Sequence, residues 1–233
     1  MDFSLLDQQI DSISADKNQI YKQLNTASAD NPNDVQLLWR LAKVALLLSD
    51  LAEKNGQKDE CKRWSIAAVG HAKAAVVAEQ QSLEAHKWLC AAVGRLSPFL
   101  PTKERIECGH EFKVHSDIAR KLDPNDRLLH HMYGRWCYEV ASLSWMERKL
   151  AATFFGTPPE STFAEALNAL EKANELRNEW IGNHLWIAKV LIAMKKPKEA
   201  LKWIDSGLQI QQNTEEDGLS HQQLIQLQNK LNK

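Results

Sequence analysis

At four places in the chain an alanine is followed, fifteen residues later, by another small residue. The pairs are Ala27 and Ala42, Ala75 and Cys90, Ala119 and Gly134, and Ala173 and Ala188. A small side chain late in one helix and another early in the next let the two helices cross closely. The fixed interval between such crossings therefore predicts a repeated unit made of helices.

Residues around the small positions indicate the kind of repeat. The segment 118–126 resembles the end of a tetratricopeptide (TPR) repeat, where proline stops one helix and Asn or Asp caps the next. A TPR unit has about 34 residues, whereas the small positions 42, 90, 134 and 188 lie 48, 44 and 54 residues apart. We therefore expect extra residues inside each hairpin, between its first and second helix.

We predict an all-α fold, a TPR-like array of antiparallel helical hairpins with elongated helices and capping helices at both ends. The chain is expected to form a single domain over 1–233, with a leading cap in 1–32, four hairpins in 33–211 and a closing helix in 212–233. The predicted helices cover 3–29, 34–54, 58–79, 81–96, 102–122, 126–153, 160–177, 182–195, 197–211 and 217–231. A hydrophobic content of 44%, with only nine glycines and seven prolines, agrees with one helical core.

The sequence carries no pattern expected of a membrane span or a signal peptide. The longest purely apolar runs, Val44–Leu48 and Ala74–Ala78, are far shorter than the ~20 residues that cross a bilayer. The acidic start Met1–Asp7 lacks the basic region of a signal peptide. We expect a cytoplasmic protein whose four cysteines, which form no C-x-x-C pair, stay reduced.

Histidines and cysteines recur on neighbouring predicted helices, at His86, Cys90, Cys108, His110 and His115. Cys108 and His110 would point about 200 degrees apart on a helix, which argues against a zinc site. Three histidines lie four residues before a small repeat position, namely His86, His130 and His184. Their recurrence at one repeat position indicates packing, so we predict no metal and no cofactor.

Catalytic patterns are also scarce. The chain contains neither a G-x-S-x-G motif nor a glycine-rich phosphate loop. Cys90 and His86 could be written as a nucleophile and its base, but a thiol buried in a helix is usually inert. We predict that the protein is not an enzyme.

The repeat register instead predicts a basic groove. In TPR stacks the first helices of the hairpins line a concave face, and the positions that point into it give Lys43, Lys87, Arg95, His131, Arg135 and Lys189. A second basic cluster follows at Lys195, Lys196, Lys198 and Lys202. Although the net charge is only -1, such a stripe would attract acidic peptides or anionic head groups. Exposed helices also carry Lys and Arg for solubility alone, which is the alternative explanation.

One block of the sequence resembles a known family. Leu129–Val140, followed by Leu143–Lys149 and Phe155–Pro159, contains a G-R-W-C-Y…L-S-W pattern. This block is similar to the regulator of microtubule dynamics family, and the resemblance extends over residues 35–210.

The resemblance implies a TPR-like, non-enzymatic protein that associates with microtubules and spindle poles and acts in chromosome segregation. Longer family members carry an N-terminal membrane anchor, and in one of them the TPR-like domain binds and transfers phospholipid. This sequence is most similar to the short, soluble founding member. We therefore expect microtubules or tubulin as the partner, with anionic phospholipid as the alternative ligand and no nucleic acid. The expected location is the cytoplasm and cytoskeleton, at microtubules, the spindle and its poles.

Overall fold

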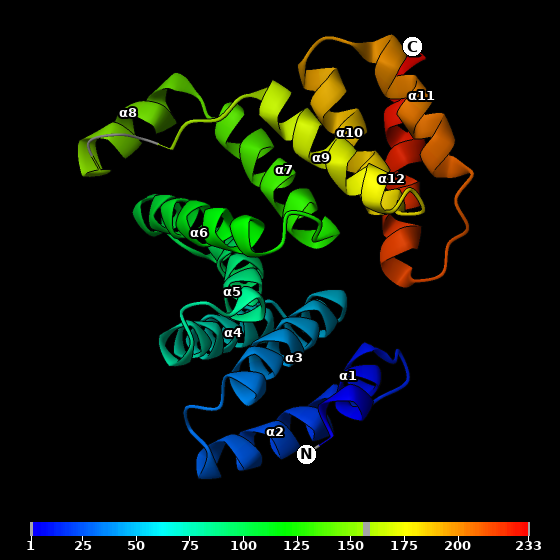
Figure 1. Ribbon diagram of the computed structural model, residues 1–233. Helices are drawn as coiled ribbons and strands as arrows, with labels where there is room; N and C mark the ends of the chain where they lie inside the picture. The colour runs from blue at the N-terminus through cyan, green and yellow to red at the C-terminus, as the bar shows by residue number, and fades with distance from the viewer. Residues whose placement is uncertain (1, 156–158, 233) are drawn as a thin grey trace. The chain divides into compact units, whose positions relative to one another are not determined.

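Every element of regular secondary structure in the part of the chain that the structure describes is a helix (Figure 1). The computed structural model describes residues 2–155 and 159–232. Positions 156–158, which belong to the family-like block of the sequence, lie outside the described residues. The prediction of an all-α fold is confirmed.

The described helices group into two compact units, Met1–Asp123 and Pro124–Lys233. Unit 1 contains α1 (Phe3–Asp11), α2 (Lys17–Asp30), α3 (Val35–Lys54), α4 (Lys58–Ala78), α5 (Leu83–Leu96), the 3-10 turn η1 (Ser97–Phe99) and α6 (Thr102–Leu122). Unit 2 contains α7 (Arg127–Ala141), α8 (Trp145–Phe155), α9 (Phe163–Leu176), α10 (Ile181–Ala193), α11 (Pro197–Leu208) and α12 (Glu215–Leu231). That both units form one domain over 1–233 stays a prediction.

Polar side chains fix the first residue of many of these helices. Before α3, Asp34 accepts a hydrogen bond from the backbone N–H of Gln36 at 2.8 Å. Before α9, Thr162 and Glu165 form a capping box in which each side chain accepts from the other residue's backbone N–H. Such caps satisfy N–H groups that have no partner within the helix, so they decide where the helix begins.

In unit 1, α3 and α4 form a long hairpin against which α2 and α5 pack. The core on one side of α3 contains Leu41 and Val44, both fully buried, together with Leu24 of α2. A second cluster joins Leu38 of α3, Ala75 of α4 and Ala85 of α5. Ala75 is fully buried there, as expected for a small side chain at a close helix crossing.

In unit 2, α7 pairs with α9 and α10 pairs with α11, while α12 closes the end of the array. The core of the second hairpin contains Ile181 and Ala188 of α10, Ile204 of α11 and Leu224 of α12. Leu224 lies so close to α11 that a Cβ atom on Gly207 would be only 2.8 Å from its Cδ1. The closing helix is therefore seated on a glycine.

Among the described residues the helices form an array of hairpins with a capping helix at each end, as predicted. The hairpins are α3/α4, α5/α6, α7/α9 and α10/α11. The elongation is also confirmed, because α3, α4 and α6 have 20, 21 and 21 residues. In the third hairpin the extra residues form α8, a separate helix between α7 and α9 (Figure 1).

Two predicted helices are each divided in two. The leading helix expected over 3–29 breaks at 12–16, where the chain is extended at Ser12 and Asp16 caps α2 by accepting from the N–H of Asn18 at 2.9 Å. The helix expected over 126–153 breaks at 142–144, where the Ser144 hydroxyl and the Glu147 carboxylate bond each other's backbone N–H. In both places a local capping side chain outcompetes continuation of the helix.

Substituting Gly134 by alanine is expected to destabilise the protein. Its Cβ would lie 2.6 Å from Cγ of Leu170 and 3.0 Å from the carbonyl oxygen of Ala166, so α7 and α9 would have to separate. We expect the free energy of unfolding to fall by about 1–3 kcal/mol, measured by urea denaturation. Gly70→Ala is the matched control, because the helix α4 leaves open space there, and it should raise stability by about 0.5–1 kcal/mol. Equal effects at both positions would contradict the close crossing.

Candidate partner-binding surfaces

The six residues predicted to line one groove are divided between the two units. Unit 1 carries Lys43, Lys87 and Arg95, whereas unit 2 carries His131, Arg135 and Lys189. Their surroundings differ, so each unit presents its own surface. That the six act together as one groove stays a prediction.

Lys43 of α3 interacts with the N-terminal helix. Its Nζ lies 2.6 Å from the Asp11 carboxylate of α1 and 5.4 Å from the ring centroid of Trp88 on α5. The lysine side chain is only 15% exposed, whereas that of Asp11 is 63% exposed. The positive charge of Lys43 is therefore neutralised within the chain by an acidic residue that faces solvent.

The other two residues of unit 1 that were predicted to bind a partner, Lys87 and Arg95, also form ion pairs. Lys87 Nζ lies 2.5 Å from the Glu84 carboxylate on the same helix. Arg95 Nη1 lies 2.7 Å from Glu53 of α3, and its Nε donates to the Ser49 hydroxyl at 3.0 Å. Arg95 thus joins α5 to α3. The ion pairs of Lys87 and Arg95 therefore stabilise unit 1 whether or not these residues also bind a partner.

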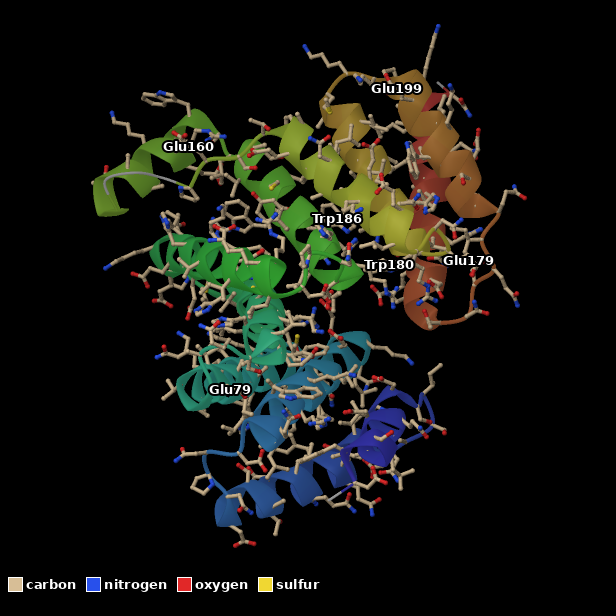
Figure 2. The ribbon with its side chains drawn as sticks, viewed as in Figure 1. Glu79, Glu160, Glu179, Trp180, Trp186 and Glu199 are labelled. Carbon is tan, nitrogen blue, oxygen red and sulfur yellow. The ribbon has the colours of Figure 1, made fainter. Side chains whose placement is uncertain are left out.

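In unit 2, Arg135 of α7 and Lys189 of α10 approach the same aromatic ring. The guanidinium of Arg135 lies 4.7 Å, and the ammonium of Lys189 4.5 Å, from the ring centroid of Trp186, which is labelled in Figure 2. Lys189 also donates a hydrogen bond to Gln223 of α12 at 3.1 Å. We call Arg135, Trp186 and Lys189 the Trp186 cluster. Both distances are within the range of cation–π attraction.

The Trp186 cluster concentrates positive charge beside partly buried aromatic surface. Arg135 is exposed, while Lys189 and Trp186 are half-buried. Burial lowers the pKa of Lys189, and the nearby Arg135 lowers it further, whereas Glu139 acts in the opposite direction. Because two cations repel each other here, an anion bound between them would relieve the repulsion.

His131 lies in the core of unit 2. The amide of Asn183 donates to the carbonyl oxygen of Leu170 at 2.9 Å, which turns its oxygen toward His131, so that Nδ1 of the imidazole donates at 2.9 Å. The ring also lies 4.2 Å from that of Trp180, and the residue is only 5% exposed. Burial lowers the pKa of His131 to about 3, so this residue is neutral at physiological pH.

The second predicted basic cluster is exposed. Lys195, Lys196 and Lys198 surround the turn from α10 to α11, and Lys202 follows on α11. Lys195 adopts a φ of 60 degrees, a left-handed conformation that closes this tight turn. Lys196 lies 3.2 Å from Glu199. The turn therefore presents several lysines to solvent, and Glu199 of α11 is the acidic residue paired with one of them.

Three residues of these surfaces were not predicted from the sequence. Trp186 lies three residues before Lys189 on α10, a spacing that brings side chains together on a helix. Asp7 and Asp11 share one face of α1 at a spacing of four and lie on the basic side chains of α3. Both spacings are readable in the sequence once the helices are known.

His86, His115 and Cys90 are engaged in packing. His86 Nδ1 lies 2.8 Å from Nδ1 of His115, and its Nε2 donates to the carbonyl oxygen of Gln80 at 3.0 Å. Cys90 lies within 3.7 Å of the Phe112 carbonyl oxygen, and burial raises the pKa of its thiol, which opposes formation of a reactive thiolate. All four cysteines are free thiols. Within the described residues no group of three or more His, Cys, Asp or Glu could hold a metal ion.

Small cavities in unit 1 include one of about 230 Å³ and one of about 300 Å³. The first is lined by residues of α4, α5 and α6 that include Lys73 and Glu111, and the second lies beside His86 and His115. Neither is lined by the residues predicted to bind a partner. Among the helices of residues 2–155 and 159–232, none is both long enough and apolar enough to cross a membrane.

Hairpins stacked through small residues define a TPR-like helical repeat protein. A solved TPR protein from Thermus thermophilus matches 90% of this chain and 91% of its own, with a TM-score of 0.61 at 15% sequence identity. A solved MamA protein matches 82% of this chain and 81% of its own, with a TM-score of 0.52 at 16% identity. These similarities establish the fold, and the TPR-like prediction is confirmed.

Sequence comparison then gives the family. The family model for Regulator of microtubule dynamics protein 1-3 matches residues 3–232. Regulator of microtubule dynamics protein 2 of Mus musculus is 33% identical over 192 residues, which cover 82% of this chain and 46% of that protein. Protein 1 of Bos taurus is 33% identical over 186 residues, which cover 79% and 58%. The chain belongs to the regulator of microtubule dynamics family, and it spans about half the length of these relatives.

The buried histidine of unit 2 predicts a loss of stability in acid. The folded-state pKa of His131, about 3, lies below the ordinary value of about 6.5, so the unfolded state takes up a proton more readily. Stability therefore falls as the pH drops from about 6.5 toward 3, by about 2 kcal/mol between pH 7 and pH 5 from this group. His131→Gln should reduce the difference between urea unfolding free energies at the two pH values.

His130→Gln is the matched control, since His130 lies at the edge of α7 and contacts the carbonyl oxygen of Pro124. The His131→Gln protein should show a smaller pH dependence than this control. If the two variants had the same pH dependence, the buried neutral state of His131 would be wrong.

Proposed function

We propose that the protein is a non-enzymatic, microtubule-associated adaptor that binds the acidic surface of tubulin through the Trp186 cluster. The family to which the chain belongs and the names of its relatives support a role in regulating microtubule dynamics. The observation that carries the choice of surface is that Arg135 and Lys189 both lie within 5 Å of the Trp186 ring.

The chemistry of the cluster suits glutamate-rich chains. A guanidinium and an ammonium can each form charge-assisted hydrogen bonds with a carboxylate. The half-buried indole of Trp186 offers apolar surface to the methylene groups of the same side chains. Lys195, Lys196, Lys198 and Lys202 are proposed as a second contact that adds long-range attraction.

The cellular setting is proposed from the family resemblance. The protein would act in the cytoplasm, at microtubules, the spindle and its poles, and contribute to chromosome segregation. These roles need only an adaptor surface, which the TPR-like fold provides without a catalytic site.

Charge reversal tests the surface. The double variant Arg135→Glu and Lys189→Glu is expected to weaken co-sedimentation with stabilised microtubules at least ~10-fold, because each charge-assisted bond contributes about 1.5–3 kcal/mol. Lys22→Glu with Lys62→Glu is the matched control, since both lysines are exposed in unit 1 and the change in net charge is the same. Equal loss in both variants would mean that net charge, rather than this surface, governs binding.

Salt and tail removal test the partner. Binding should weaken steeply as salt rises, because exposed charges are screened over about 10 Å at 0.1 M. Microtubules whose acidic tails have been removed by protease should pellet less protein. Salt-independent pelleting would overturn the electrostatic basis of the proposal. If no pelleting occurs at low salt but native mass spectrometry finds a co-purified phospholipid, the lipid-binding alternative would replace it.

A further inference from the structure

The N-terminal helix α1 places acidic side chains on the basic side chains of α3. Asp7 accepts two hydrogen bonds from Arg40, at 2.8 Å to Nε and 2.6 Å to Nη2, and Asp11 lies 2.6 Å from Lys43. Asp7 and Asp11 are four residues apart, as are Leu6 and Ile10. One face of α1 is therefore apolar and its edge is acidic.

The basic side chains beneath α1 lie on aromatic rings. The guanidinium of Arg40 is 3.9 Å from the ring centroid of Trp39, and Lys43 is 5.4 Å from that of Trp88. Unit 1 therefore contains two cations backed by two tryptophans. This arrangement has the same components as the Trp186 cluster, but here carboxylates of the chain itself are bound to it.

The apolar face of α1 is seated in a matching recess. Leu6 and Ile10 are 6% and 1% exposed and pack with Leu24 of α2 and with Leu37 and Leu41 of α3. The surface below α1 thus binds a short helix through two apolar residues and two carboxylates of that helix. Figure 1 shows α1 beside α2 and α3, joined to α2 by a short connection.

The connection and the charges indicate how α1 could leave. The link 12–16 is not helical, and Ile13 within it is 83% exposed, while Ala15 packs against the core of unit 1. Asp11, next to the link, has a side chain that is 63% exposed, whereas the Arg40 side chain at the other end is 5% exposed. Release would therefore begin at the Asp11–Lys43 pair, where solvent already competes.

We propose that Arg40, Lys43, Trp39 and Trp88 form a second binding site, for an acidic amphipathic helix of a partner protein, and that α1 occupies this site as an internal competitor. The partner helix would carry two carboxylates four residues apart and two apolar residues at the same spacing. The inference shares with the proposed function only the need for an acidic partner, because its residues lie in unit 1 and the Trp186 cluster lies in unit 2.

The test uses the full chain and a fluorescent synthetic peptide of residues 1–15 as the probe for such a helix. The wild-type protein should bind the peptide weakly, because its own α1 competes at a high effective concentration. Asp11→Asn weakens the seating of the internal helix, because it removes the carboxylate that neutralises Lys43, whose side chain is only 15% exposed. We expect the Asp11→Asn protein to bind the peptide at least ~5-fold more tightly.

Three further measurements make the result specific. Asp30→Asn, an exposed change on α2, should leave peptide binding at the wild-type level. Lys43→Glu added to Asp11→Asn should abolish the gain, as should Asn at positions 7 and 11 of the peptide. On addition of peptide to the Asp11→Asn protein, hydrogen exchange should increase in α1 and not in α12.

Equal peptide affinity in the wild-type and Asp11→Asn proteins, with unchanged exchange in α1, would overturn the inference. Dimerisation of the Asp11→Asn protein that the peptide reverses would assign the site to the α1 of a second copy and overturn a separate partner. The charge-reversal variant at Arg135 and Lys189 should keep its peptide response, so failure of microtubule binding and failure of this site are told apart.

Discussion

Close approach of helices at small side chains is the constraint on which the rest of the structure depends. Ala75 in unit 1 and Gly134 in unit 2 lie where a larger side chain would force neighbouring helices apart. The residue that follows each small residue is then held at a fixed position around the helix axis, relative to the helix–helix contact. Arg135 follows Gly134 on α7, and Lys189 follows Ala188 on α10. The packing that joins the hairpins therefore also sets the direction of the two cations that meet at Trp186.

The same constraint explains why the fold could be predicted from the sequence. The spacing of small residues reports the helix crossings, and the eight hairpin helices occur in the predicted order. Two breaks were missed because they depend on single side chains rather than on periodicity. Asp16 caps α2 inside a run that otherwise reads as helical, and Ser144 with Glu147 does the same before α8. The Ser-x-x-Glu spacing at Ser144 and Glu147, typical of a helix start, can be read in the sequence. The apolar periodicity around it instead led to the prediction of one continuous helix over 126–153.

The candidate site was predictable only in part, because a repeat register gives the direction of a side chain and not its partners. Lys43 and Arg95 bind Asp11 and Glu53, which come from other helices. His131 was predicted to face a partner, yet Asn183 of α10 and the ring of Trp180 enclose it. Contacts of this kind join residues far apart in the chain, and a single sequence carries no direct record of them.

The predicted cations of the two units have different surroundings, which the net charge of -1 conceals. In unit 1 each predicted cation lies within 2.7 Å of a carboxylate of the chain, so a partner must displace an existing anion. In unit 2 the pKa of Lys189 falls through burial and through repulsion by Arg135, while Glu139 acts in the opposite direction. An incoming carboxylate there gains an ion pair and also removes a repulsion. The proposal for the Trp186 cluster therefore depends on repulsion between two cations, whereas the proposal for α1 depends on displacement of an existing ion pair.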